Sequence, residues 1–189
     1  MIKVKKLKKD TLVGKEVPTN LNGHAGRFIE ELLEVDGYGL DRRGEGPDMP
    51  ELNVEVKTRD LGATSPQTVG TMTVTAIKST PYPSSSIFAK LQQQLRVKTK
   101  CGTIVESQIR DFSDSYIQSK IGESYEGARQ KIIGGNRGNY ISGGPYGYFE
   151  KCRHTKNSYA WRMSQAMMDS LETMSSNTPA FNSLFEVIK

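Results

Sequence analysis

The clearest pattern of apolar and polar positions lies in residues 25–36. The apolar residues there recur at positions i, i+3, i+4, i+7 and i+8, and they are Ala25, Phe28, Ile29, Leu32 and Leu33. Positions three and four apart share one face of a helix, so this stripe predicts an amphipathic helix. Turn and cap residues precede it in segment 17–24, and Gly37 follows it. We therefore expect the helix to begin near Ala25 and to end before Gly37.

A pattern with a period of two runs over residues 52–58. Apolar residues alternate there with polar ones, and successive side chains of a strand point to opposite faces of its sheet. The pattern predicts a strand whose apolar face is buried and whose other face carries Glu55 and Lys57. Further strands are expected at residues 70–77, 103–109 and 148–153.

Three later segments are expected to be helices. The first opens after the serines at 84–86, which are typical N-cap residues, and places Ile87, Phe88, Leu91 and Leu95 on one face. The other two are expected at residues 114–133, where Gly122 and Gly127 interrupt the helix, and at residues 158–174. The glycine-rich segments 37–47 and 134–147 are expected to be loops.

Length and charge narrow the class of protein. A chain of 189 residues is expected to be one domain, and its mixture of strands and helices predicts an α/β fold with a central mixed sheet flanked by helices. Lys and Arg number 26 against 21 Asp and Glu, a net charge of +5, which favours a polyanionic partner. The Lys-rich segment 1–9 is then either a DNA-contacting arm or a solvated terminus.

The sequence gives no sign of a membrane or secreted location. It contains nothing like the roughly 20 apolar residues of a membrane helix, and no apolar run follows the basic N-terminus as in a secretory signal. Cys101 and Cys152 lack CxxC spacing, and with His24 and His154 they do not complete a zinc-binding set. We therefore expect a cytoplasmic protein with two free thiols and no membrane partner.

The strongest candidate for chemistry is the segment from Asp48 to Lys57. Asp48 lies seven residues before Glu55, between Pro47 and Pro50, and both prolines stiffen the turn. Two carboxylates can hold Mg²⁺, a hard cation that prefers oxygen ligands. Such a metal polarises a phosphate and lowers the pKa of a bound water, while a nearby lysine can orient that water or stabilise charge on phosphorus. The segment therefore fits the hydrolysis of a phosphodiester.

Glu55 and Lys57 are not specific by themselves, because Glu-x-Lys on an exposed strand is usually a solvated ion pair. The preceding helix adds a third acidic group. Glu30 lies on the shoulder of its apolar stripe, one turn after Gly26, where the missing side chain leaves room for another element or a phosphate. Glu31 and Glu34 lie further round the helix and are expected to be solvated.

These segments resemble the PD-(D/E)xK nucleases, and within them the MutH-like branch of a mismatch-repair nicking endonuclease and related type II restriction enzymes. Segment 26–33 is similar to the family's Gly-x-x-apolar-Glu-x-x-Leu helix, and segment 48–58 has its Asp-x6-Glu-x-Lys spacing. The resemblance implies a restriction-endonuclease-like core with catalytic residues Glu30, Asp48, Glu55, Lys57 and Lys90. It implies that Asp48 and Glu55 hold the metal. Glu34 remains an alternative to Glu30, because the following loop is longer than the family pattern.

The resemblance also implies a function. The leading hypothesis is a Mg²⁺-dependent endonuclease, with Mn²⁺ as a substitute, that cuts double-stranded DNA at a specific sequence. The alternatives are a MutH-like nickase that cuts one strand, and a non-catalytic DNA-binding protein that keeps the fold. The catalytic part is expected in about residues 1–100, and a part that completes the DNA cleft in about residues 101–189. Monomer and homodimer both stay open.

Contacts to DNA are expected in the glycine-rich loop and in the strand that follows it. Arg137 and Asn139 have side chains suited to base edges, Arg to guanine and Asn to adenine. Lys151 and Arg153 alternate on the expected strand and would flank the groove. The alternative is an ordinary surface loop followed by a solvated strand. Trp161, with Met163, Met167 and Met168 nearby, is more typical of a core than of a binding platform.

Overall fold

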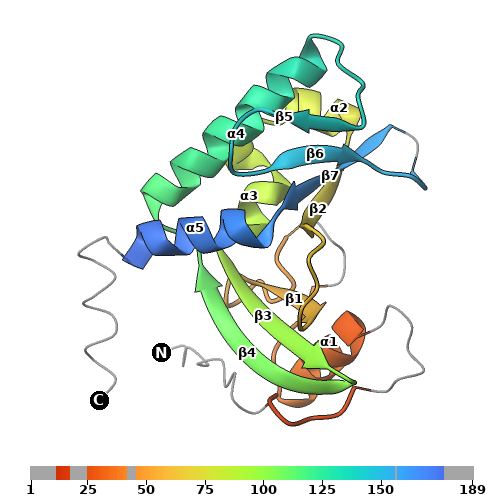
Figure 1. Ribbon diagram of the computed structural model, residues 1–189, viewed down its shortest axis with the longest axis vertical. Helices are drawn as coiled ribbons and strands as arrows, with labels where there is room; N and C mark the ends of the chain where they lie inside the picture. Colours follow the sequence, from red (N-terminus) through yellow and green to blue (C-terminus); the bar gives the residue numbers. More distant parts are fainter. Residues whose placement is uncertain (1–11, 18–24, 42–45, 156, 177–189) are drawn as a thin grey trace. The chain divides into compact units, whose positions relative to one another are not determined.

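The computed structural model describes residues 12–17, 25–41, 46–155 and 157–176. The Lys-rich segment 1–9 and His24 lie outside these described residues. The chain divides into two compact units, Met1–Ala63 with Gln93–Arg110 and Thr64–Gln92 with Asp111–Lys189. Each unit combines helices with strands (Figure 1), which confirms the α/β class. The expected division near residue 100 falls within the first unit.

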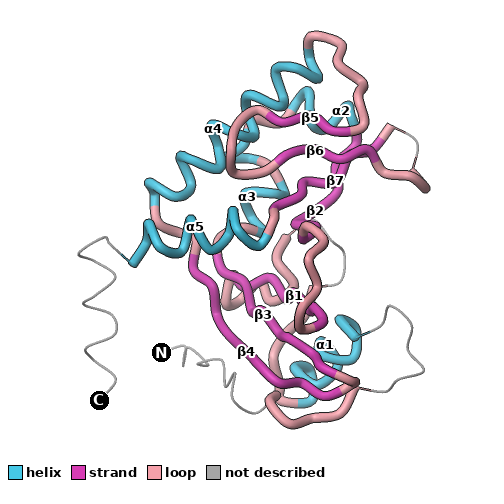
Figure 2. Tube along the Cα trace, in the orientation of Figure 1, coloured by secondary structure: helices cyan, strands magenta, loops and turns pink. Residues whose placement is uncertain are grey.

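The first unit contains a three-stranded sheet and one helix. Its strands are β1 (Val54–Asp60), β3 (Gln93–Lys100) and β4 (Thr103–Asp111), in the order β1-β3-β4, and its helix is α1 (Ala25–Val35). β1 and β3 run parallel. β3 turns into β4 through Cys101 and Gly102, whose φ angles of 50° and 81° suit the two-residue turn of a hairpin. The sheet is therefore mixed, as the sequence predicted. Its strands β1, β3 and β4 are magenta in Figure 2.

The core of the first unit confirms the two strongest patterns in the sequence. Ile29 and Leu33 of α1 are buried together with Val54 and Val56 of β1 in one apolar cluster. Leu95, Val97 and Ile104 bring the other two strands into the same cluster. α1 therefore packs on the face of the sheet from which Val54 and Val56 project, and Glu55 and Lys57 project from the opposite face.

The second unit contains an antiparallel sheet of four strands in the order β2-β7-β6-β5. These strands are β2 (Gln67–Thr73), β5 (Tyr140–Ser142), β6 (Tyr148–Lys151) and β7 (Ser158–Met163). Its helices are α2 (Val74–Ser79), α3 (Ser86–Lys90), α4 (Ser115–Ile133) and α5 (Gln165–Ser176), with a short 3-10 helix at Tyr82–Ser84. The longest helix, α4, lies against β5 and β6 (Figure 1).

Aromatic side chains fill the core of the second unit. Trp161 and Phe149 meet edge to face, with ring centroids 4.9 Å apart, and Tyr125 of α4 packs on both. Trp161, Met163 and Met168 are completely buried, which confirms their expected place in a core.

Four predicted elements were wrong at their ends. The strand expected at 148–153 ends at Lys151, so Arg153 lies in the bend that follows β6 and does not alternate with Lys151 on a strand. Segment 70–77 was expected to be one strand, but β2 ends at Thr73, whose Oγ1 accepts a hydrogen bond from Ala76 N and starts α2. Segment 158–174 was expected to be one helix, but β7 comes first, and Ser164 Oγ then accepts from Met167 N before α5. The helix that follows the serines at 84–86 ends at Lys90, so Leu95 lies in β3 instead.

Gly122 and Gly127 do not interrupt α4, which was also predicted wrongly. Both allow close packing. A methyl group at Gly127 would lie 2.6 Å from the carbonyl oxygen of Gly143, and one at Gly122 would lie 2.9 Å from Cδ1 of Tyr82. The expected loop at 134–147 contains the short strand β5.

The cysteines and the length of the helices bear on two further expectations. Cys101 and Cys152 are free thiols, as predicted. Within the described ranges, every helix is too short or too polar to pass through a bilayer.

Candidate active site

A tight turn between residues 49 and 54 brings Asp48 and Glu55 together. Met49 and Val54 form an antiparallel bridge, in which Met49 N donates to Val54 O at 2.9 Å and Val54 N donates to Met49 O at 3.1 Å. The next pair outward across such a bridge is Asp48 and Glu55, and directly opposed residues project to the same side. The seven-residue spacing between Asp48 and Glu55 is therefore the spacing that a tight turn bridged at Met49 and Val54 produces.

Three hydrogen bonds fix the carboxylates of this turn. Val56 N donates to Asp48 Oδ2 at 2.8 Å, and Asp48 N donates to Glu55 Oε2 at 3.3 Å. Lys57 Nζ donates to the other oxygen of Glu55, Oε1, at 2.6 Å. Each acidic side chain is thus oriented by a donor from the neighbouring part of the same turn and strand.

Glu55 is a buried carboxylate, with only 2% of its surface exposed. Burying a charge is costly unless an opposite charge and hydrogen bonds compensate it. The Lys57 ammonium and the Asp48 N–H supply that compensation on the two oxygens of the carboxylate. Glu55 and Lys57 are therefore a largely shielded ion pair, and not the solvated pair that Glu-x-Lys usually forms.

The donor set of the turn fits a hard divalent cation. Mg²⁺ is commonly held by one or two carboxylates, while waters and substrate phosphate oxygens fill its other positions. Asp48 and Glu55 offer two carboxylates from opposed positions. Among the described residues, no group of three His, Cys, Asp or Glu side chains comes together in a way that could hold a metal. The two carboxylates of Asp48 and Glu55 are oxygen ligands of the kind that Mg²⁺ prefers.

Glu30 belongs to the same unit, on the face of α1 that is nearest to β1. A methyl group at Gly26 would lie 3.9 Å from Oγ1 of Thr58 in β1, and Glu30 is one turn further along. Glu30 is half-buried, whereas Glu34 is exposed. Because α1 covers the face of β1 opposite to Glu55, a role for Glu30 in the site stays a prediction.

Lys90 lies in the second unit, as the last residue of α3. A methyl group at Gly70 in β2 would lie 3.5 Å from Cδ of Lys90, so the stem of the lysine passes over that strand. Its expected place near a scissile phosphate stays a prediction.

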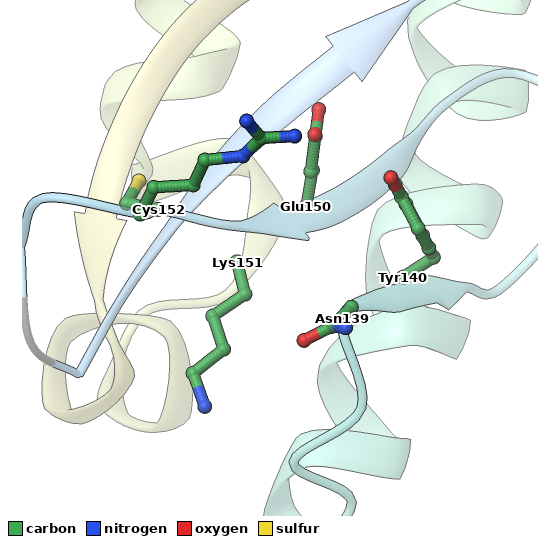
Figure 3. Close-up of a pocket in the computed structure, with 6 residues that line it drawn as sticks. Asn139, Tyr140, Glu150, Lys151 and Cys152 are labelled. Atoms are coloured by element: carbon green, nitrogen blue, oxygen red, sulfur yellow. The ribbon is translucent and has the colours of Figure 1, made fainter.

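Three of the four residues expected to contact DNA line one pocket of the second unit. Asn139, Lys151 and Arg153 share a cavity of about 310 Å³ with Tyr140, Glu150 and Cys152 (Figure 3). Tyr140 and Glu150 are partners across β5 and β6 and project to the same side, whereas Lys151 projects to the other (Figure 3).

Arg137 is not among the residues that line this pocket. Its Nη1 donates to the carbonyl oxygens of Ile132 and Asn136, each at 2.9 Å. The guanidinium therefore caps the C-terminal end of α4, where backbone carbonyl groups have no hydrogen-bond donor within the helix.

An ion pair between a carboxylate and an arginine lies at the pocket. Glu150 Oε2 lies 2.7 Å from Nε of Arg162 on β7. Burial raises the pKa of Tyr148, and the nearby Glu150 raises it further. The ring of Tyr148 meets that of Tyr140 edge to face, with centroids 6.0 Å apart. Tyr140 itself is 66% exposed, so one aromatic ring stands open to solvent at the pocket.

Two residues near the Glu55–Lys57 pair were missed by the sequence analysis. In the parallel pairing of β1 with β3, Gln94 is the partner of Glu55 and Arg96 is the partner of Lys57. Gln94 is 1% exposed and Arg96 is 8% exposed. The alternation from Gln94 to Lys98 is the signal that could have revealed this strand, but Leu95 also fitted the helical spacing from Ile87.

This sequence matches no protein-family model, and no curated protein matches it significantly. The resemblance to PD-(D/E)xK nucleases therefore rests on the sequence motif alone and stays a prediction.

Proposed function

We propose that this chain is a Mg²⁺-dependent endonuclease of restriction type, which cuts double-stranded DNA at a specific sequence in the cytoplasm. The observation that carries the proposal is the turn that opposes Asp48 to Glu55, with Lys57 Nζ 2.6 Å from the Glu55 carboxylate. Two opposed carboxylates beside a shielded ammonium are the groups that metal-assisted phosphodiester hydrolysis requires.

The residues of the turn would divide the work as follows. Asp48 and Glu55 would hold Mg²⁺, or Mn²⁺ in its place, which polarises the phosphate and lowers the pKa of a bound water. Lys57 orients the attacking water and stabilises the negative charge that grows on the phosphate oxygens. The hydrogen bonds from Val56 N and Asp48 N hold both carboxylates in place before substrate arrives. The reaction adds water across one P–O bond of the DNA backbone.

The pocket of the second unit supplies the proposed DNA contacts. Lys151 and Arg153 are exposed cations suited to phosphates, and Asn139 beside them is suited to an adenine edge. Arg137 is a weaker candidate, because its guanidinium already donates to two backbone carbonyl groups.

A plasmid digest tests the proposal. The purified protein with Mg²⁺ should convert supercoiled plasmid into linear fragments whose sequenced ends share one motif, and EDTA should stop the reaction. Lys57→Ala should abolish cutting and keep DNA binding. Lys100→Ala is the matched control, because it removes the same charge from the exposed end of β3. Cutting by Lys57→Ala at the parent rate would show that the proposed role of Lys57 is wrong.

Other outcomes of the same digest favour the alternatives. Open-circular product that never becomes linear would indicate a nickase. DNA binding without cutting, and with no effect of Mg²⁺ or Mn²⁺, would indicate a binding protein that keeps the fold. Calorimetric titration of Asp48→Asn and Glu55→Gln with Mn²⁺ separates loss of the metal from loss of the water-orienting lysine.

A further inference from the structure

The four-stranded sheet of the second unit has an apolar face and a face that carries polar side chains and tyrosines. Phe149 and Trp161 project from the apolar face into the aromatic core. Successive residues of a strand alternate between faces, so their neighbours Tyr148, Glu150 and Arg162 project to the other face. Two adjoining cavities, of about 310 and 410 Å³, lie beside this second face and share part of their lining.

Tyr140 presents an aromatic ring at the smaller of these cavities. It is in register with Glu150 across β5 and β6 and projects to the same side (Figure 3). The ring is 66% exposed, and the ring of Tyr148 meets it edge to face, with centroids 6.0 Å apart. Because a ring has two faces and Tyr148 can contact only one of them, one face of Tyr140 stays open to solvent.

Hydrogen bonds fix the backbone that carries this ring. Just before Tyr140, the carbonyl oxygen of Asn139 accepts from Lys151 N at 2.8 Å. The carbonyl oxygen of Gly138 accepts from the hydroxyl group of Tyr159 at 3.1 Å. A tyrosine side chain also has only two rotatable bonds, so holding its ring in one position costs little conformational entropy. The ring is therefore presented in a defined place before a ligand arrives.

The charges around the two cavities favour an anion. Glu150 is the only acid among the described residues that line them, whereas Lys151, Arg153 and Arg162 are cations. Glu150 Oε2 lies 2.7 Å from Nε of Arg162, so this pair is balanced. Lys151 and Arg153 form no ion pair with another described residue. An open aromatic ring beside two such cations is suited to nucleic acid, because the cations can contact phosphates while the ring stacks on a base.

A stacking ring selects among the forms of DNA. In an intact duplex each base lies between its neighbours, and a protein reaches only the base edges in the grooves. A tyrosine ring can stack only on a base that has left this stack, as in a single strand or in a duplex that opens locally. The cavities leave room for such a base, since Thr68, Thr71 and Ala160 are small side chains in the lining of the larger one.

We propose that Tyr140 stacks on an unstacked DNA base, and that Lys151 and Arg153 bind the phosphates beside it. The inference rests on the proposed function for the identity of the ligand, which is DNA. It adds a base-binding residue and a preference for DNA whose bases are accessible from their faces. Tyr140 then binds the substrate and takes no part in the hydrolysis.

Binding of single-stranded DNA in EDTA tests this contact without catalysis. The full chain is titrated with a fluorescent oligonucleotide, and with a strand of the same length in which abasic sites replace the nucleotides that carry bases. Both strands carry the same phosphates, so the difference in affinity measures contacts to bases. Tyr140→Leu should weaken binding of the ordinary strand by about 5- to 20-fold, the lower part of the range for one base stacked on one aromatic ring. It should leave binding of the abasic strand unchanged. Tyr140→Phe should keep both affinities, because it keeps the ring.

Tyr116→Leu is the matched control. Tyr116 is 54% exposed in the first turn of α4, and the ammonium of Lys120 lies 5.5 Å from the centroid of its ring. It is thus another exposed tyrosine beside a cation, but it lines neither cavity, so both affinities should stay at the parent values. Circular dichroism checks that each variant folds. If Tyr140→Leu does not fold, Tyr140→Thr replaces it, because threonine suits a strand and removes the ring.

Three results would overturn the inference. No loss of affinity in Tyr140→Leu would show that the ring does not bind DNA. An equal loss on the ordinary and the abasic strand would show that the ring contacts sugars or phosphates. A loss in Tyr140→Phe as large as that in Tyr140→Leu would assign the effect to the hydroxyl group.

The same variants separate this inference from the proposed function. If the parent cuts plasmid while Tyr140→Leu binds both strands as tightly as the parent, the inference fails and the nuclease function stands. If the parent stacks on bases through Tyr140 but cuts nothing with Mg²⁺, the nuclease function fails and the inference stands. If the parent binds no DNA, both fail.

Discussion

Replacing Lys57 with methionine tests the electrostatics of the candidate site in the metal-free protein. Methionine keeps most of the length of the side chain and removes the ammonium that lies 2.6 Å from Oε1 of Glu55. Glu55 is 2% exposed, and removing one partner of a buried ion pair costs about 3–5 kcal/mol. Lys57 is itself partly exposed and Asp48 N still donates to Glu55. We therefore expect a smaller loss, of about 2–3 kcal/mol, in the free energy of unfolding.

Urea denaturation in EDTA, followed by circular dichroism, measures this loss. Added Mg²⁺ or Mn²⁺ should restore part of it, because a divalent cation between the carboxylates replaces the missing positive charge. Glu55→Gln is the matched variant. It removes the buried charge and leaves Lys57 able to reach water, so its loss should be smaller and the metal should not restore it.

Two results would refute this reasoning. A loss below about 0.5 kcal/mol for Lys57→Met, the size of an ordinary surface substitution, would mean that the Glu55 charge does not depend on Lys57. Equal stabilisation of both variants by Mg²⁺ would mean that the metal binds somewhere other than the Asp48–Glu55 turn.

Three further predictions concern the turn, the core and the pH dependence. Asp48→Ala should weaken Mn²⁺ binding in calorimetry and loosen the turn, because Val56 N loses its acceptor at 2.8 Å; an unchanged affinity would contradict the ligand role. Gly127→Ala should lower the free energy of unfolding in urea by about 1–3 kcal/mol, because its methyl group would lie 2.6 Å from the Gly143 carbonyl oxygen; a neutral effect would show that the backbone yields. Burial raises the pKa of Tyr125 from 10.0 to about 12. As the pH rises, the unfolded chain therefore loses the Tyr125 proton before the folded protein does. The stability that is present below pH 10 should fall between pH 10 and 12. Tyr125→Phe should flatten that part of the melting-temperature profile, and parallel profiles would contradict the assignment.

Periodicity was sufficient to predict the elements whose pattern of apolar residues fits only one kind of secondary structure within the segment itself. The apolar stripe of α1 and the alternation in β1 each fit one kind of structure, and both were found close to the expected residues. The opposed carboxylates were also accessible from sequence, because the turn from Met49 to Val54 is short enough for the spacing to place Asp48 beside Glu55.

Elements that depend on distant pairing could not be predicted in the same way. Leu95 fits the helical spacing from Ile87, and only the pairing with β1 makes it part of a strand. Tyr159, Trp161 and Met163, by contrast, alternate with the period of two of a strand. The expected helix at 158–174 overlooked this local signal, and the three residues pair with β2. Arg96 was missed as a neighbour of Lys57 because neither segment alone determines the register between strands that are distant in the sequence.

The pairing of β1 with β3 also has a consequence for how the site is assembled as the chain is made. The turn that holds Asp48 and Glu55 can close as soon as residue 57 is available, whereas Arg96 joins it only after the intervening segment, Thr64–Gln92 of the second unit, has been synthesised. Contacts between such distant segments must first overcome the entropy cost of closing the loop between them, so they form late. We expect a nascent chain ending before β3 to form the turn that opposes Asp48 to Glu55 but to lack the side chains that β3 adds beside Glu55 and Lys57, so that any metal binding by the turn would precede completion of the candidate site.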